Sequence, residues 1–152
     1  MGHKLLAKIQ PVLLLLLALQ LFACRPALLP APPSNLPVSI ELDESFPLMV
    51  GQQGALESTG LTLQLQTVLN DWRCPSQVNC AAAGNATVII DVWLAGQDPS
   101  RLEMNINPPP FEQEMLYNAY QIRLLKLDPY PKTIDQVIPQ QDYRATFEVS
   151  LR

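Results

Sequence analysis

The sequence contains few of the residues that catalysis and metal binding usually require. It has one histidine, His3, three cysteines and only 10 Lys and Arg residues among its 152 positions. A zinc site needs four ligands, and a nucleophilic cysteine needs a neighbouring base. Long apolar runs are also lacking, because residues 12–19 fall well short of the about 20 residues that a membrane-spanning helix needs. Composition alone therefore argues against metal, thiol and transmembrane functions.

The first 23 residues have the features of a secretory signal. His3, Lys4 and Lys8 form a short basic region, and the apolar run of residues 12–19 follows it. Residues 21–24, Leu-Phe-Ala-Cys, resemble the lipobox of bacterial lipoproteins. The resemblance implies cleavage before Cys24, a diacylglycerol thioether on its sulfur, and acylation of the new amino terminus with a fatty acid such as palmitate. An ordinary secretory signal with an incidental cysteine is the alternative.

A lipidated Cys24 would place the protein in the bacterial cell envelope, outside the cytoplasm, with the membrane as its first partner. Two or three acyl chains suffice for stable anchoring. Removal of residues 1–23 would also remove the histidine and leave eight Lys and Arg against 14 Asp and Glu, a formal charge of −6. An acidic protein repels phosphate backbones, so no nucleic-acid partner is expected.

The remaining chain divides into a tether and one domain. Residues 24–37 begin at the lipidated cysteine and contain five prolines. Proline favours extended backbone, so this segment is expected to form a polyproline-like spacer of about 3.1 Å per residue. Residues 38–152 have the length of a single domain.

Apolar and polar residues alternate with the period of a half-buried strand in residues 60–71, 86–94, 120–127 and 143–151. In residues 120–127 the phase slips at Leu125, as a β-bulge would cause. Residues 38–42, 47–50, 55–57 and 101–106 are weaker candidates, and residues 111–120 are expected to hold a helical turn or two. Seven or eight short strands predict an all-β fold, an antiparallel β-sandwich with an immunoglobulin-like or similar Greek-key arrangement.

Cys74 and Cys80 are the cysteines that remain once Cys24 carries lipid. Their even number and their extracytoplasmic location predict a disulfide. A ring of about seven residues would stabilise the fold by roughly 2 kcal/mol through loop entropy. Zinc, redox and nucleophile functions are the alternatives, but the additional ligands, the Cys-x-x-Cys spacing and the base that they need are missing.

The stretch around these cysteines resembles an uncharacterised bacterial family of secreted or lipid-anchored proteins, which has an Arg-Cys-Pro…Cys…Gly-Asn-Ala motif. The likeness extends over about residues 45–151 and implies no particular activity. The matching positions are Asp71, Arg73, Cys74, Pro75, Cys80, Gly84, Asn85, Ala86, Leu125, Leu127, Pro129, Tyr130 and Pro131.

These observations favour a non-enzymatic binding module with no cofactor and no metal. Loops on a rigid scaffold commonly carry function, so the disulfide loop is the first candidate for contact with an envelope or extracellular protein or glycan. Inhibition of an extracellular protease is a specific version of this hypothesis, and residues 108–117 are a second candidate loop. The candidate residues of the disulfide loop are Arg73, Pro75, Ser76, Gln77, Val78 and Asn79.

Two further expectations concern acids and tryptophans. Asp71, Asp91, Asp98 and Asp128 lie at or near the expected strands, so an extracytoplasmic enzyme that uses carboxylates or calcium is the alternative function. Trp72 and Trp93 are expected to be core aromatics that flank the disulfide, and an exposed tryptophan would instead be a candidate contact residue.

Overall fold

The structure, a computed structural model, describes residues 37–107 and 112–152. The signal segment, Cys24 and most of the expected tether lie outside these residues. No helix in the described ranges is long and apolar enough to cross a bilayer.

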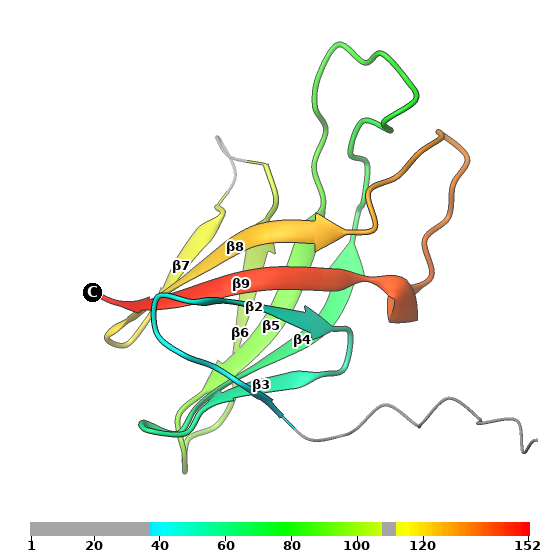
Figure 1. Cartoon of the computed structure of the whole chain (residues 1–152). Helices are drawn as coiled ribbons and strands as arrows, with labels where there is room; N and C mark the ends of the chain where they lie inside the picture. The colour runs from blue at the N-terminus through cyan, green and yellow to red at the C-terminus, as the bar shows by residue number, and fades with distance from the viewer. Residues whose placement is uncertain (1–36, 108–111) are drawn as a thin grey trace, which may run out of the picture. The chain divides into compact units, whose positions relative to one another are not determined.

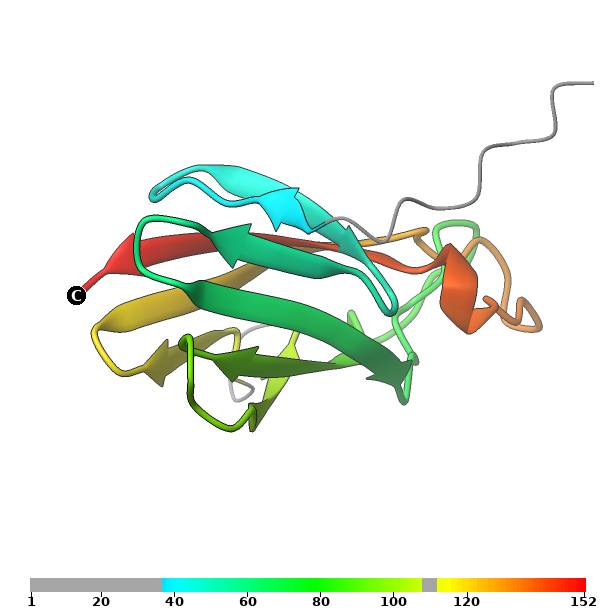
Figure 2. The ribbon, with the colours of Figure 1, turned by 90° about the horizontal axis from the view of Figure 1, so that it is seen from below.

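Two β-sheets face each other (Figures 1 and 2). The five-stranded sheet has the order β1 (Val38–Ser39), β3 (Gln53–Leu56), β4 (Leu61–Leu69), β5 (Thr87–Trp93) and β6 (Ser100–Asn105). The four-stranded sheet has the order β2 (Ser45–Met49), β9 (Arg144–Leu151), β8 (Tyr120–Asp128) and β7 (Glu114–Tyr117). A 3₁₀ turn, η2 (Gln140–Asp142), leads into β9. The predicted β-sandwich is confirmed, with nine strands in the described residues where seven or eight were expected.

The strand order specifies which kind of sandwich this is. The first strand of the four-stranded sheet, β2, returns to pair with the last, β9, as in a Greek key. Four consecutive strands, β3 to β6, lie side by side in the other sheet. An immunoglobulin domain does not have this order, because its sheets are formed by strands A, B, E and D and by strands C, F and G, and neither contains four consecutive strands. The strand pairs are antiparallel except for the two-residue pairing of β1 with β3.

The core follows from the predicted alternation. Leu61, Leu63 and Leu65 of β4 are fully buried, and they belong to one core cluster with Phe147 and other buried residues of the opposite sheet. Burying a large aliphatic side chain contributes roughly 1.5–3 kcal/mol, so this layer supplies the main stabilisation of the fold. Leu151 departs from the pattern, since it is exposed at the end of β9.

The predicted bulge in residues 120–127 is confirmed. The register of β8 against β9 shifts between Leu124 and Lys126. Leu125 is left exposed, whereas Leu124 and Leu127 are buried on the core side. The bulge therefore explains how two adjacent leucines occur in a strand with only one apolar face.

The expectation of a helical turn in residues 111–120 is wrong for the part that is described. Residues 114–117 form strand β7, and an Asn118-Ala119 turn joins it to β8. Asn118 adopts a positive φ of 52°, which asparagine tolerates better than most residues. Met115 and Tyr117 pack against the core with the two-residue period of a strand. The three prolines at residues 108–110 favour the start of a helix. The residues that follow them nevertheless form a strand.

Candidate functional site

Two long loops project from the same end of the sandwich (Figure 1). One joins β4 to β5 and contains the disulfide, and the other joins β8 to β9. They are hydrogen-bonded side by side, because the Ser76 and Gln77 amides donate to the Pro131 and Lys132 carbonyls at 2.9 and 3.1 Å. We call residues 69–86 and 126–144 the loop end, and the other described residues the sandwich body.

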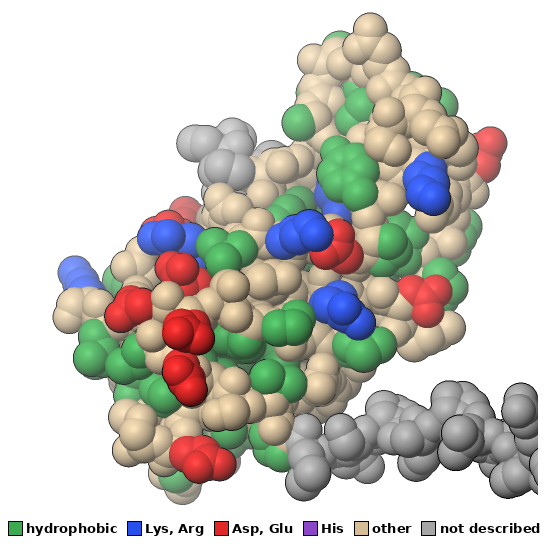
Figure 3. Space-filling model, viewed as in Figure 1, with side chains coloured by type: hydrophobic (Ala, Val, Ile, Leu, Met, Phe, Trp, Pro, Cys, Tyr) green, Lys and Arg blue, Asp and Glu red, His purple; other side chains and the backbone are tan. Residues whose placement is uncertain are grey.

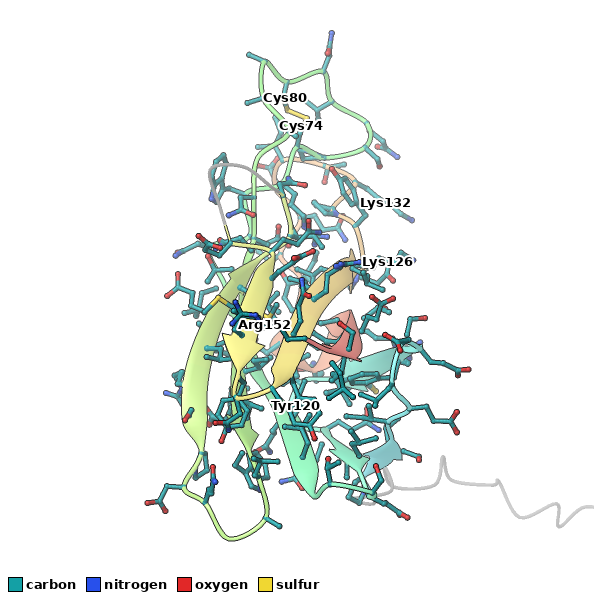
Figure 4. The ribbon with its side chains drawn as sticks, turned by 90° about the vertical axis from the view of Figure 1, so that its left-hand side faces the viewer. Cys74, Cys80, Tyr120, Lys126, Lys132 and Arg152 are labelled. Carbon is teal, nitrogen blue, oxygen red and sulfur yellow. A yellow bond between two sulfur atoms is a disulfide. The ribbon has the colours of Figure 1, made fainter. Side chains whose placement is uncertain are left out.

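The predicted disulfide is present. Cys74 and Cys80 are bonded, with their Cα atoms 6.0 Å apart. The Val78 amide donates to the Pro75 carbonyl at 3.0 Å and closes a turn inside the ring. Figure 4 shows the bridge near the tip of the projecting loop. The two sulfur atoms therefore form a structural bridge that fixes the shape of the loop.

Arg73, one of the expected binding residues, is 3% exposed, because its side chain points into the base of the loop end. Its Nε and Nη2 atoms donate to the two carboxylate oxygens of Asp71 at 2.8 and 2.7 Å. Nη1 donates to the Leu127 carbonyl at 2.5 Å, and Nη2 also donates to the Pro129 carbonyl at 2.9 Å. The planar guanidinium fork suits this task, because one side chain satisfies several acceptors at once. Arg73 thereby ties both loops together.

Asp71 accepts a further hydrogen bond from the Tyr143 hydroxyl at 2.9 Å. Burial raises the pKa of Asp71, but the hydrogen bonds from Arg73 and Tyr143 and the charge of Arg73 outweigh it and hold the pKa below its usual value. Burial, followed by the hydrogen bond to Asp71, raises the pKa of Tyr143 to about 12. The network thus stabilises the ionised form of the Asp71 carboxylate and the neutral form of the Tyr143 phenol.

Tyr130 covers the outer side of this network. The Arg73 guanidinium carbon lies 5.0 Å from the centroid of the Tyr130 ring, which is within cation–π range. One side of the ring lies against Arg73, while 46% of the residue stays exposed. The ring is therefore held against Arg73 on its inner side and is open to solvent on its outer side.

A second polar network fixes the return of the disulfide loop into β5. Asn85 is 3% exposed, and its amide donates to the Asn105 side-chain oxygen at 2.6 Å. Its carbonyl accepts from the Trp72 amide at 2.8 Å. Gly84 has a φ of +72°, and a Cβ there would clash with the Trp72 carbonyl and lie 2.9 Å from the Arg73 Cα. Glycine is required at this position for both reasons.

The β8–β9 loop is also fastened to β4 through one side chain. The Gln140 oxygen accepts from the Thr67 hydroxyl and the Val68 amide at 2.9 and 3.0 Å, and the Gln140 amide donates to the Val68 carbonyl at 2.8 Å. Buried polar side chains in the described residues all have a hydrogen-bond partner. The loop end is consequently a fixed structure, although it contains little regular secondary structure.

The surface of the loop end is rich in apolar side chains. Trp72 is 57% exposed, so its expected place in the core is wrong, whereas Trp93 is half-buried. Single exposed apolar residues are ordinary, but a group of them on one part of a surface indicates an interaction site. Of nine large apolar residues exposed in the described ranges, five belong to the loop end: Leu69, Trp72, Tyr130, Ile134 and Val137.

Charge is distributed unevenly between the two parts. The loop end carries four cations and four acids, whereas the described sandwich body carries three cations and ten acids. In the view of Figure 3, a group of acidic side chains lies over the sandwich body, and several Lys and Arg side chains lie toward the loop end. The loop end is therefore an electrically balanced, apolar-rich region on an acidic molecule.

The other residues of the expected binding loop have mixed exposure. Ser76, Gln77 and Asn79 are exposed, while Pro75 and Val78 are half-buried. In the second expected loop, residues 108–111 lie outside the described ranges, and residues 114–117 belong to β7.

The carboxylates singled out in the sequence do not converge. Asp71 pairs with Arg73, Asp91 with Arg101 at 2.9 Å and Asp128 with Lys126 at 2.8 Å, while Asp98 is exposed in the turn before β6. No group of three His, Cys, Asp or Glu side chains in the described part of the chain could hold a metal ion. These acids form local ion pairs or face solvent.

Comparison with family models, curated proteins and solved structures gave no match for this chain.

Several residues that build the loop end carried no functional signal in the sequence. Tyr143 and Gln140 each reach partners 72 or 73 residues away, so no local pattern could have placed them. Arg73 was singled out for the wrong role, although its spacing from Asp71 puts the two side chains on one side of an extended chain. Of the positions that carry the family resemblance, Asp71, Arg73, Gly84, Asn85, Pro129 and Tyr130 all lie in or against these networks.

Proposed function

We propose that this is a lipid-anchored, non-enzymatic protein of the bacterial cell envelope, whose β-sandwich presents the loop end to an envelope or extracellular protein or glycan. The anchor would be the acylated Cys24, and residues 25–37 would be the spacer between the lipid and the domain. The lipobox-like residues 21–24 support the anchor, and the loop end supports the binding role.

One observation carries the binding role: a rigid, apolar-rich and electrically balanced surface occurs at one end of an otherwise acidic domain. Ordering a flexible loop on binding costs free energy, and a loop that is already fixed avoids much of that cost. The disulfide, the Arg73 network and Gln140 each fix this surface before any partner arrives. Exposed tryptophan and tyrosine are also the residues that most often dominate binding energy at interfaces.

The geometry gives less support to a substrate-like protease inhibitor. A segment that adds to a protease as an extended strand must offer unpaired backbone groups. Here the Ser76 and Gln77 amides are already bonded to the neighbouring loop, and the ring is folded into a turn. The exposed apolar side chains lie on both loops, which suits a broader contact surface better than insertion of one loop.

Site-specific photo-crosslinking in cells tests the binding role. A photoreactive amino acid at Val137, which is 88% exposed, should give crosslinked adducts with an envelope component. The same amino acid at Glu103, exposed on β6 of the sandwich body, is the matched control. Adducts from both positions alike, or from neither, would contradict a binding role for the loop end.

Mass spectrometry of the protein purified from membranes tests the anchor separately. We expect an acylated N-terminal Cys24 in the natural chain, and a chain without lipid in the soluble fraction for Cys24→Ser. A natural chain whose N-terminus carries no lipid would refute anchoring while leaving the binding role to be judged by crosslinking.

A further inference from the structure

An open groove of about 580 Å³ lies on the outer side of the loop end. It runs between the disulfide loop, represented by Ser76, and the ends of β8 and β9. Its size is within the range of small-ligand sites. Its ionisable and aromatic lining consists of Lys126, Asp128, Tyr130, Lys132, Asp142 and Arg144.

The groove is lined by three cations and two acids, Asp128 and Asp142, so it carries a formal charge of +1 on an acidic protein. Lys126 is neutralised by Asp128 at 2.8 Å, whereas Lys132 and Arg144 form no ion pair with any described residue. Three of the four cations of the loop end line this one groove, and the fourth, Arg73, is buried beneath Tyr130. Figure 4 shows Lys126 and Lys132 on the same side of the molecule. Guanidinium and ammonium groups that lack a partner attract carboxylates and phosphates.

Tyr130 adds a flat apolar surface beside these cations. Because Arg73 holds the ring from the buried side, the exposed part of the ring is presented in a fixed position. A pyranose ring has an apolar face that can lie on such a surface, and its hydroxyls can donate to Asp142 and exchange hydrogen bonds with Ser76. The lining therefore combines a stacking surface, cations and hydrogen-bond acceptors within one groove.

An extended acidic peptide fits the same groove less well. Peptides commonly bind by adding a strand to an unpaired sheet edge. At the groove, Arg144 of β9 pairs with both β2 and β8, and Lys126 and Asp128 of β8 pair with β9. β7 pairs only with the first half of β8, but near the groove the Leu127 carbonyl already accepts a hydrogen bond from Arg73. Few backbone groups are therefore left for a peptide strand, which favours recognition through side chains and a ring-shaped ligand with an acidic group.

We propose that this groove binds an anionic saccharide, a sugar whose ring carries a carboxylate or a phosphate group. The proposal deepens the proposed function and rests on it, because it assigns a ligand class to the loop end. Tyr130 would contact the apolar face of the sugar, and Lys132 and Arg144 would bind its anionic group.

Isothermal titration of the full-length protein in detergent micelles tests the ligand class. Tetragalacturonate supplies carboxylates and glucose 6-phosphate supplies a phosphate, so their relative affinities distinguish the two anionic groups. Maltotetraose is the neutral control, and tetraglutamate tests whether acidic peptides bind equally. We expect at least one anionic sugar to bind tenfold or more tightly than both controls. Equal binding of maltotetraose or tetraglutamate, or no binding of either anionic sugar, would overturn the proposal.

Variants with matched changes in charge test the site. Lys132→Gln with Arg144→Gln should weaken binding of the anionic sugar tenfold or more. Arg101→Gln with Arg152→Gln removes the same charge from two exposed positions outside the groove. This control pair should change the affinity for the anionic sugar less than twofold. A similar loss in both pairs would show that binding depends only on net charge and would refute the site.

The aromatic contact has its own control. Tyr130→Phe keeps the ring and should retain affinity within about twofold, whereas Tyr130→Ala should lose fivefold or more, with thermal melting used to confirm that both variants fold. Unchanged affinity in a folded Tyr130→Ala protein would contradict sugar stacking. Crosslinking from Val137 does not depend on the groove cations, so failure of this proposal is distinguishable from failure of the proposed function.

Discussion

Replacing Arg73 by methionine is the most direct test of how the loop end is held together. Methionine has a similar length but can neither donate a hydrogen bond nor carry charge. The variant would leave the Asp71 carboxylate, whose side chain is only 10% exposed, without its cation. It would also remove the donors to the Leu127 carbonyl at the end of β8 and to the Pro129 carbonyl in the opposite loop.

The expected cost follows from burial. Removing one partner of a buried ion pair typically costs about 3–5 kcal/mol, because the remaining charge stays in a poorly solvated place. That is a large part of the about 5–15 kcal/mol that stabilises an ordinary domain. Arg73→Met with Asp71→Asn removes the unpaired charge as well, so the double variant should be more stable than Arg73→Met alone. Arg101→Met is the matched control, since the Arg101–Asp91 pair has similar geometry but the Arg101 side chain is 67% exposed; its effect should be small.

The pH dependence should change sign in the variant. The natural protein holds the pKa of Asp71 below its usual value, so the stabilisation from this group is present above about pH 4 and is lost as the pH falls through the lowered pKa. Without Arg73, burial dominates and should raise the pKa of Asp71. The variant then gains stability as the pH falls, because the folded state binds the proton more tightly than the unfolded state does.

Urea denaturation followed by circular dichroism at pH 7 and pH 3.5 measures both effects. The difference in unfolding free energy between the natural protein and Arg73→Met should be large at pH 7 and clearly smaller at pH 3.5. A difference below about 1 kcal/mol at pH 7 would be at odds with a buried pair. An equal difference at both pH values would show that Asp71 is not the group left unpaired.

Four further predictions concern other parts of the loop end. The pKa of Tyr143 is raised to about 12, so the folded protein should lose roughly 2 kcal/mol of stability between pH 10 and pH 12, and Tyr143→Phe should abolish this alkaline limb in urea titrations. Gly84→Ala should lower the unfolding free energy by more than about 2 kcal/mol, because a positive φ and a clash with the Trp72 carbonyl combine; Gly51→Ala has a positive φ with open space around it and should cost less in the same assay. Cys74→Ser with Cys80→Ser should cost roughly 2 kcal/mol in chemical denaturation, and no change would mean that the ring does not restrict the unfolded chain. Trp72→Ala should leave the melting temperature nearly unchanged, since the side chain is mostly exposed, and a large decrease would contradict that exposure.

The body of the sandwich was largely predictable because its strands carry a local signal. Leucines at every second position identified β4, and the phase slip at Leu125 located the bulge in β8. β7 was missed because only four residues form it, and their packing depends on the hairpin with β8. A short strand next to prolines has too few alternating positions for the sequence to specify its structure.

The loop end was less predictable because long-range contacts build it. The disulfide could be predicted from cysteine number and expected location. The inward direction of Arg73 could not, since its carbonyl partners lie 54 and 56 residues further along the chain. Trp72 was expected in the core because it flanks the disulfide, but Asn70, with a φ of 49°, ends the regular backbone of β4 two residues earlier. The alternation of β4 therefore does not set the direction of the Trp72 side chain.

The position of Trp72 gives the protein an optical reporter of its own. The Trp72 amide donates a hydrogen bond to the Asn85 carbonyl, so the backbone that carries the indole is fixed, while the ring is mostly exposed to solvent. A molecule that covers the ring would shift its fluorescence emission toward shorter wavelengths. With Trp93→Phe removing the other indole, occupancy of this end of the protein becomes visible in a cuvette without any added dye.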